Sequence, residues 1–227
     1  MKYAALFSGG KDSALALWKA QKAGLDVKYL VTVFPARDDS YMFHKPNLEF
    51  VPTLADSLDL NFIKVKTEGV KEEELTDLKN GLNKLDVGGV ITGAVASSYQ
   101  FKRLKRLTKE LDLDLYAPLW EVKQQDILDT LLKNDFKVII VSVAAMGFDK
   151  DWLGREIDSG CVSDLKVLNR KYAINVAGEG GEYESFVLDS PNYEWGFKVV
   201  HAEREWDGHR GVYKIKKIKK KEKMDLF

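Results

Sequence analysis

Hydrophobic and polar positions in the first half of the chain form two alternating patterns, short β-branched or aromatic runs and longer amphipathic runs. Leu75, Leu78, Leu82 and Leu85 repeat at the interval typical of one helix face. The short runs predict strands at Tyr3–Phe7, Tyr29–Phe34, Phe62–Lys66 and Gly89–Thr92. The longer runs predict helices at Ser13–Ala23, Asn47–Leu58, Lys71–Leu85 and Tyr99–Leu111. Strands alternating with helices indicate an α/β fold with a doubly wound parallel sheet.

The second half has a looser pattern, which predicts a smaller α+β domain. A short strand is expected at Leu115–Trp120, ending at a proline, and a domain boundary near Pro118–Gln125. Further helices are expected at Gln124–Lys133 and Cys161–Arg170, and strands at Phe136–Val143, Tyr183–Leu188, Trp195–Glu205 and Gly211–Lys217. We therefore expect a larger domain at 1–120 and a smaller one at 121–227, the latter with a lysine-rich, solvated tail.

A glycine-rich loop follows the first predicted strand, where α/β sheets bind ligands. Its sequence is Ser8-Gly9-Gly10-Lys11-Asp12-Ser13. The glycines allow close backbone approach, the helix start offers N–H groups, and the lysine adds a cation, which together favour a phosphate site. The loop fits neither the Walker A pattern nor the dinucleotide fingerprint. The alternative is a tight turn with Asp12 or Ser13 as helix cap.

Two other segments combine small and polar residues. Thr92 ends the fourth predicted strand, Gly93 follows it, and Ser98 is placed to cap the next helix, although taken alone the segment is better explained as a plain strand-to-helix connection. In the second half, three glutamates crowd a glycine-rich loop, which favours a bound cation or donor over a solvated hairpin turn. That acidic loop contains Gly178, Glu179, Gly180, Gly181, Glu182, Tyr183 and Glu184.

The loop SGGKDS resembles the pyrophosphate loop of the N-type ATP pyrophosphatases. The resemblance implies that ATP is cleaved between its α and β phosphates, with Mg²⁺ bridging the pyrophosphate. It also implies that 1–120 is the ATP-binding domain and 121–227 the substrate-binding domain. Asp12 is the candidate for contact with Mg²⁺, although a role as helix cap explains it equally well and one residue can do both. The residues placed around the pyrophosphate are Ser8, Gly9, Gly10, Lys11 and Ser13.

Five segments in order, SGGKDS, TGAVASSYQ, PLW, DWLGREID and GEGGEYES, resemble the diphthine–ammonia ligase family, and the likeness runs from Tyr3 to about Leu188. It implies ATP-dependent amidation of diphthine on translation elongation factor 2. Lys11, Asp12 and Glu182 would be catalytic, and Thr92 and Gly93 would join the ATP site. Substrate-binding residues would be Ser98, Tyr99, Gln100, Arg103 and the acidic loop from Glu179 to Glu184. Lys105 and the lysine tail depart from the family pattern.

The substrate's quaternary ammonium favours aromatic faces and carboxylates. Tyr99, Trp120 and Tyr183 are candidates for that pocket, although each is equally explained by packing, and for Trp120 we favour the core. Because the sole cysteine, Cys161, lies mid-chain, the sequence lacks the N-terminal cysteine nucleophile of glutamine-dependent relatives. We therefore expect free ammonium as the nitrogen donor.

Charge and composition narrow the partners. The chain has 35 basic and 35 acidic residues, and six lysines lie in residues 216–227, so the rest is mildly acidic. This distribution argues against stable nucleic-acid binding. Since the sequence has no long apolar run and no signal pattern, we expect a cytoplasmic protein without membrane contact. An exposed sheet edge would be compatible with a homodimer. The alternatives are a tRNA-modifying ATP pyrophosphatase and a non-catalytic ATP-binding module.

Overall fold

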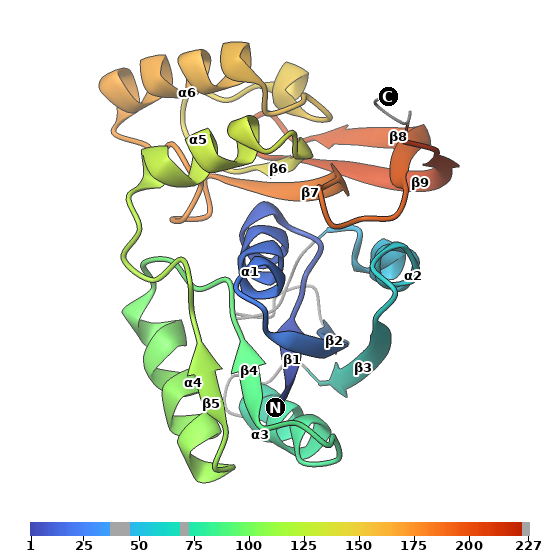
Figure 1. Cartoon of the computed structure of the whole chain (residues 1–227). Coiled ribbons are helices and arrows are strands. Elements are labelled where there is room, and N and C mark those ends of the chain that lie inside the picture. Colours follow the sequence, from blue (N-terminus) through green and yellow to red (C-terminus); the bar gives the residue numbers. More distant parts are fainter. Residues whose placement is uncertain (37–45, 69–72, 224–227) are drawn as a thin grey trace. The chain divides into compact units, whose positions relative to one another are not determined.

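The computed structural model describes residues 1–36, 46–68 and 73–223, and the chain divides into two units, Met1–Glu121 and Val122–Phe227 (Figure 1). Within this described part, no helix is long and apolar enough to cross a membrane.

The first unit is built on a parallel sheet of five strands in the order β3-β2-β1-β4-β5. The strands are β1 (Lys2–Leu6), β2 (Asp26–Pro35), β3 (Asn61–Thr67), β4 (Gly89–Ile91) and β5 (Asp114–Tyr116). The helical segments are α1 (Lys11–Lys22), η1 (Leu48–Phe50), α2 (Val51–Ser57), α3 (Glu73–Leu82) and α4 (Ser98–Glu110). The chain adds β2 and β3 on one side of β1 and then returns to add β4 and β5 on the other side. The strand order therefore reverses between β1 and β4, and the carboxyl ends of these two strands mark the switch point of the sheet.

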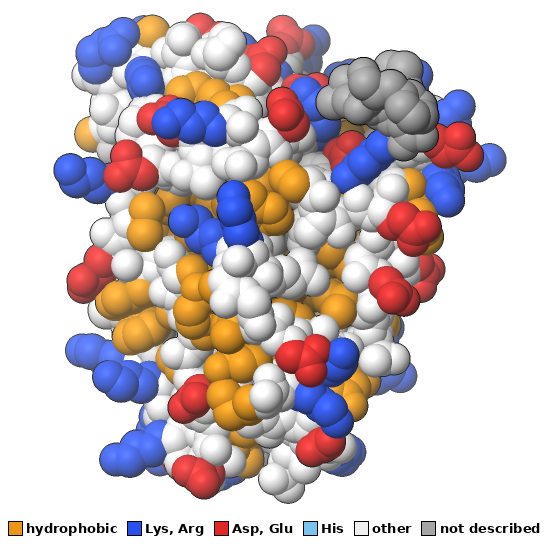
Figure 2. Space-filling model, viewed as in Figure 1, with side chains coloured by type: hydrophobic (Ala, Val, Ile, Leu, Met, Phe, Trp, Pro, Cys, Tyr) orange, Lys and Arg blue, Asp and Glu red, His pale blue; other side chains and the backbone are white. Residues whose placement is uncertain are grey.

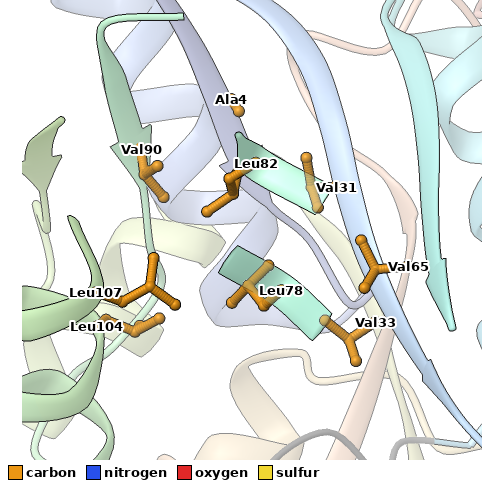
Figure 3. Packing of buried hydrophobic residues seen from close by; sticks show 9 residues of the cluster. All are labelled: Ala4, Val31, Val33, Val65, Leu78, Leu82, Val90, Leu104 and Leu107. Atoms are coloured by element: carbon orange, nitrogen blue, oxygen red, sulfur yellow. The ribbon is translucent and has the colours of Figure 1, made fainter. Parts of the chain in front are cut away.

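Helices cover both faces of this sheet, which confirms the doubly wound α/β fold. Leu78 and Leu82 of α3 and Leu104 and Leu107 of α4 lie in one buried cluster with valines and an alanine from the strands (Figure 3). The strand members of that cluster are Ala4, Val31, Val33, Val65 and Val90. On the opposite face, α1 lies over the central strands (Figure 1). Leu15 and Leu17 of that helix are fully buried.

Two predicted elements of the first unit differ from the structure. The helix expected at Asn47–Leu58 begins as the 3₁₀ turn η1 and becomes α-helical only at Val51. This start places Pro52 in the first turn of α2, where a helix accommodates proline best. The strand expected at Leu115–Trp120 ends at Tyr116, because Pro118 has no N–H to donate to a ladder. The first two residues of the helix expected at Lys71–Leu85 lie outside the described residues.

The second unit is an antiparallel sheet in the order β7-β6-β9-β8, with two α-helices (Figure 1). Its core includes Phe186, Leu128, Leu131 and Leu165, all essentially inaccessible to solvent. These elements confirm a smaller α+β part. They are α5 (Gln124–Lys133), β6 (Lys137–Val143), η2 (Lys150–Trp152), α6 (Ser159–Tyr172), β7 (Tyr183–Asp189), β8 (Gly196–Trp206) and β9 (Gly211–Lys221).

The lysine-rich segment is not the solvated tail that the charge run predicts. Residues up to Lys221 belong to β9, which pairs with β8 along its whole length. Two of its lysines form cross-strand ion pairs, Lys214 with Glu205 at 2.8 Å and Lys216 with Glu203 at 3.0 Å. The apolar residue Ile215, 2% exposed, anchors the strand, so burial of one face outweighs the like-charge repulsion on the other.

Candidate active site

The glycine loop lies between β1 and α1, at the switch point of the sheet. The Phe7 N–H donates to the Val31 carbonyl at 2.9 Å, and the buried Thr32 hydroxyl donates to the Phe7 carbonyl at 2.7 Å, which fixes the start of the loop. Gly9 then takes a φ of 77°, a left-handed conformation that glycine adopts without strain. The chain turns sharply here and points the first N–H groups of α1 toward the edge of the sheet.

Serine side chains hold this loop closed. The Ser13 hydroxyl accepts a hydrogen bond from the Ser8 N–H at 3.2 Å and donates one to the Gly10 carbonyl at 2.9 Å. The Ser8 hydroxyl lies 3.4 Å from the Gly10 N–H. α1 begins at Lys11, and its N-cap is Gly10, without a side-chain cap. The alternative that Asp12 or Ser13 caps the helix is therefore wrong.

Lys11 is a nearly buried cation at the first position of α1. Its residue is 3% exposed, and its Nζ donates to both Asp12 carboxylate oxygens, at 2.9 and 2.7 Å. A buried ammonium is costly without a counterion, and the Asp12 carboxylate supplies one here. The Asp12 side chain is more open, at 28% exposed, and remains able to meet a hydrated cation.

The loop after β4 touches the glycine loop directly. A Cβ built on Gly93 would lie 2.7 Å from both the Asp12 carbonyl carbon and the Ser13 nitrogen. Thr92 beside it is buried, and its hydroxyl accepts from the Ala94 N–H at 3.3 Å. The structure therefore brings together the two segments that the sequence assigns to the nucleotide site.

Helix α4 presents the polar and aromatic candidates of the first unit. It begins at Ser98, and the capping residue is Ser97, whose hydroxyl accepts from the Gln100 N–H at 3.3 Å, so the expected capping role of Ser98 is wrong. The Arg103 guanidinium lies over the half-buried Tyr99 ring at 4.1 Å, an arrangement favourable to a cation–π interaction.

Trp120 is half-buried and not a core residue. Its ring stacks on Phe101 with centroids 3.9 Å apart and planes 14° apart. The neighbouring Leu119 is fully buried and anchors this end of the unit. The Phe101–Trp120 pair therefore leaves part of an aromatic surface accessible near the end of β5, as a quaternary ammonium pocket requires.

The acidic loop of the second unit is organised around Glu182. One carboxylate oxygen accepts from the Asn175 N–H at 2.8 Å, and the other accepts from the Gly180 N–H at 2.8 Å. Gly178 and Gly181 have φ values of 74° and 82°, so the turn needs glycine at both positions. The closely spaced glutamates are thus accommodated partly by backbone donors.

The other residues of the acidic loop divide by burial. Tyr183 is 2% exposed, and its hydroxyl donates to the Val176 carbonyl at 3.0 Å, which favours packing over contact with a ligand. Glu179 and Glu184 are half-exposed. Asn175, which the sequence pattern missed, shapes the same loop, because its side chain accepts from the Ala177 N–H at 2.9 Å.

Metal ligation has little support from protein groups alone. Among the residues that the structure describes, no group of three or more His, Cys, Asp or Glu side chains could hold a metal ion. Mg²⁺ commonly binds proteins through one or two carboxylates and takes its other ligands from phosphates and water. Asp12, beside the glycine loop, fits that mode.

The parallel sheet and its glycine loop at the switch point define a protein of the doubly wound α/β class, in which ligands bind beyond the carboxyl ends of the strands. Residues 1–115 match the diphthamide synthase N-terminal domain, and residues 123–221 match the diphthamide synthase C-terminal domain. The chain belongs to the diphthamide synthase family.

Curated relatives carry the name diphthine–ammonia ligase. The Bos taurus protein is 34% identical over 217 residues, which cover 86% of this chain and 81% of the relative, and the Homo sapiens protein gives the same values. The Schizosaccharomyces pombe protein is 30% identical over 225 residues, 90% of this chain and 37% of the relative. A solved structure titled as a predicted subunit of tRNA methyltransferase from Methanocaldococcus jannaschii covers 84% of this chain and 98% of its own at 13% identity, with a TM-score of 0.42, too low to bear on function.

Proposed function

We propose that the protein is a diphthine–ammonia ligase, which uses ATP to convert the diphthine carboxylate of translation elongation factor 2 into an amide. The observation that carries this proposal is the buried Lys11 at the start of α1, in a chain both of whose halves match diphthamide synthase domains. A carboxylate does not react with ammonia directly, because oxide is a poor leaving group. Activation by ATP supplies a better one.

In the first step, a diphthine carboxylate oxygen attacks the α-phosphorus of ATP, and pyrophosphate leaves. Lys11 and the first N–H groups of α1 would bind the departing phosphates, where they stabilise the charge that develops. Gly9 and Gly10 would let the phosphates approach the backbone, and Ser8 and Ser13 hold the loop in shape. Mg²⁺ at Asp12 would neutralise further phosphate charge when bound.

In the second step, neutral ammonia attacks the acyl carbon, the C–O bond to AMP breaks, and one proton is lost. We assign Glu182 to positioning the acidic loop, because both of its oxygens already accept backbone N–H groups. Glu179 and Glu184, which are both half-exposed, are the candidates to hold ammonium and take its proton. The Phe101–Trp120 pair and Tyr99 are the proposed contacts for the quaternary ammonium.

The test is reconstitution of the reaction with purified protein, ATP, Mg²⁺, ammonium and diphthine-bearing elongation factor 2. Amide on the factor, measured by mass spectrometry, should appear with an equal amount of AMP. Ammonium should support the reaction, and glutamine alone should not. AMP release that responds to tRNA and not to the factor would instead favour a tRNA-modifying enzyme, and ATP binding without turnover would favour a non-catalytic module.

A further inference from the structure

The β8–β9 hairpin carries a strong local charge in a chain that is neutral as a whole. Residues 196–223 contain ten lysines and arginines against four aspartates and glutamates, so the rest of the chain has the opposite excess. Most of that charge is in β9. In the view of Figure 2, several Lys and Arg side chains lie at the upper right, with Asp and Glu side chains among them.

Alternation along the strands sorts these lysines onto two faces. Lys217, Lys219 and Lys221 follow one another at two-residue intervals and so lie on the same face of β9. Lys198 of β8 is the direct cross-strand partner of Lys219 and joins them, and His201 faces Lys217. All four lysines are exposed, and we call them the lysine face. On the opposite face Phe197 and Ile215 are buried, and Ile215 lies there, two residues before Lys217, because the register shifts between His201 and Ala202.

The lysines of the lysine face differ from the other lysines of the hairpin in their ion pairs and ring contacts. Lys214 and Lys216 pair with glutamates, Lys220 lies 3.8 Å from the Trp195 ring centroid, and Lys223 donates to two backbone carbonyls. Within residues 1–36, 46–68 and 73–223, no lysine of the lysine face has an ion pair. Like charges directly opposite each other, such as Lys198 and Lys219, destabilise a hairpin.

The chemistry of the lysine face indicates which polyanion it fits. It contains no arginine, the residue best suited to bidentate phosphate recognition, and no Phe, Tyr or Trp ring on which a base could stack. Lysines are point charges on flexible stems, suited to the scattered carboxylates of a protein surface and to steering its approach. These properties favour an acidic protein patch over RNA.

We propose that the lysine face docks an acidic patch on the protein substrate and accelerates its capture. This inference rests on the proposed function for the identity of the partner, but it concerns binding and not chemistry. Four like charges on one rigid ribbon make the association rate sensitive to salt, because exposed charges are screened over about 10 Å at moderate ionic strength.

The test compares two triple variants with equal change of charge. K217E/K219E/K221E reverses three charges of the lysine face, and K133E/K166E/R170E reverses three exposed charges on α5 and α6 of the same unit. Lys219→Glu also creates an opposite-charge pair with Lys198, so the first variant should melt at or above the wild-type temperature. A change in binding then cannot arise from unfolding.

The readout is the association rate of diphthine-bearing elongation factor 2 with the immobilised protein, at low and high salt. We expect K217E/K219E/K221E to lower that rate about ten-fold or more at low salt, with a smaller effect at high salt, while K133E/K166E/R170E stays near wild type. Equal loss in both variants, unchanged binding in the first, or no binding by the wild type overturns the proposal. So does tRNA binding through the lysine face without binding of the factor.

The outcome separates docking from catalysis. If the factor binds through the lysine face but is never amidated, the docking surface stands and the proposed function fails. If the factor is amidated and K217E/K219E/K221E captures it at the wild-type rate, the proposed function stands and the docking surface fails.

Discussion

Gly93 lies directly against the backbone of Asp12, since a Cβ at position 93 would come within 2.7 Å of the Asp12 carbonyl carbon and 2.8 Å of its carbonyl oxygen. Real Cβ atoms do not approach backbone so closely, so this contact requires glycine. The loop after β4 therefore sets the position of the glycine loop, and the two form one structural element at the switch point.

Gly93→Ala should impair ATP binding without abolishing the fold. The added methyl must push the two loops apart, at a cost of about 1–3 kcal/mol in the free energy of unfolding. The displaced N–H groups of α1 should weaken ATP binding, measured by titration calorimetry. The control is Ala96→Ser, an exposed position in the same loop. Wild-type affinity in Gly93→Ala would show that the contact does not shape the nucleotide site.

Lys11→Met should reduce adenylation by about a hundred-fold or more, because it removes a preorganised positive charge while keeping the apolar stem. The measurement is pyrophosphate release in the presence of the factor. Since Lys11 is nearly buried and paired with Asp12, this change also leaves a carboxylate without its counterion. The double variant K11M/D12N removes that carboxylate charge, and recovery of its melting temperature would show that Lys11→Met is destabilised by the unpaired carboxylate. Full activity in either variant contradicts the phosphate site.

Glu182→Ala should loosen the acidic loop and impair amidation while sparing ATP binding. It removes acceptors from the Asn175 and Gly180 N–H groups, at a cost of about 1–3 kcal/mol. Glu182→Gln keeps one acceptor and should lie between Ala and wild type. A positioning residue takes no part in proton transfer. The pH dependence of the ammonium-driven amidation rate should therefore be the same in Glu182→Gln as in the wild type. Loss of ATP affinity in Glu182→Ala would instead assign the acidic loop to nucleotide binding.

Cys161 should be almost unreactive in the native protein. It is fully buried, and burial raises the pKa of its thiol to about 12, so thiolate is scarce near neutral pH. Because the folded-state pKa is raised, the native state should lose stability as the pH rises from about 9, where the unfolded thiol ionises, toward 12. The chain has one cysteine, so Ellman's reagent reports this thiol alone. Rapid labelling at pH 8 without denaturant would contradict it.

Elements with a regular apolar period could be predicted from the sequence. The helix at Gln124–Lys133 agrees with α5 at both ends because its apolar residues keep one helical face, with Ile127, Leu128 and Leu131 buried. The end of β9 could not be predicted in the same way. Ile215 and Ile218 are three residues apart, so the alternation typical of a strand is lost, and only the fold accommodates this spacing, through a register shift between His201 and Ala202.

The candidate site was predictable only where local chemistry determines it. The role of the glycines and Lys11 follows from a strand, a turn and a helix start, all within a few residues. The contacts of Glu182 with Asn175 and of Gly93 with Asp12 depend on chain segments that come together only in the fold. The cap at Ser97 in place of Ser98 reflects a one-residue uncertainty that pattern alone does not resolve.

The transfer of oxygen from diphthine to AMP tests the central claim most directly. Elongation factor 2 carrying diphthine with an ¹⁸O-labelled carboxylate is incubated with the protein, ATP, Mg²⁺ and ammonium, and the nucleotide products are measured by mass spectrometry. Attack of the carboxylate on the α-phosphorus predicts AMP with one ¹⁸O atom for each amide formed. Unlabelled AMP, or labelled phosphate accompanied by ADP, would contradict it.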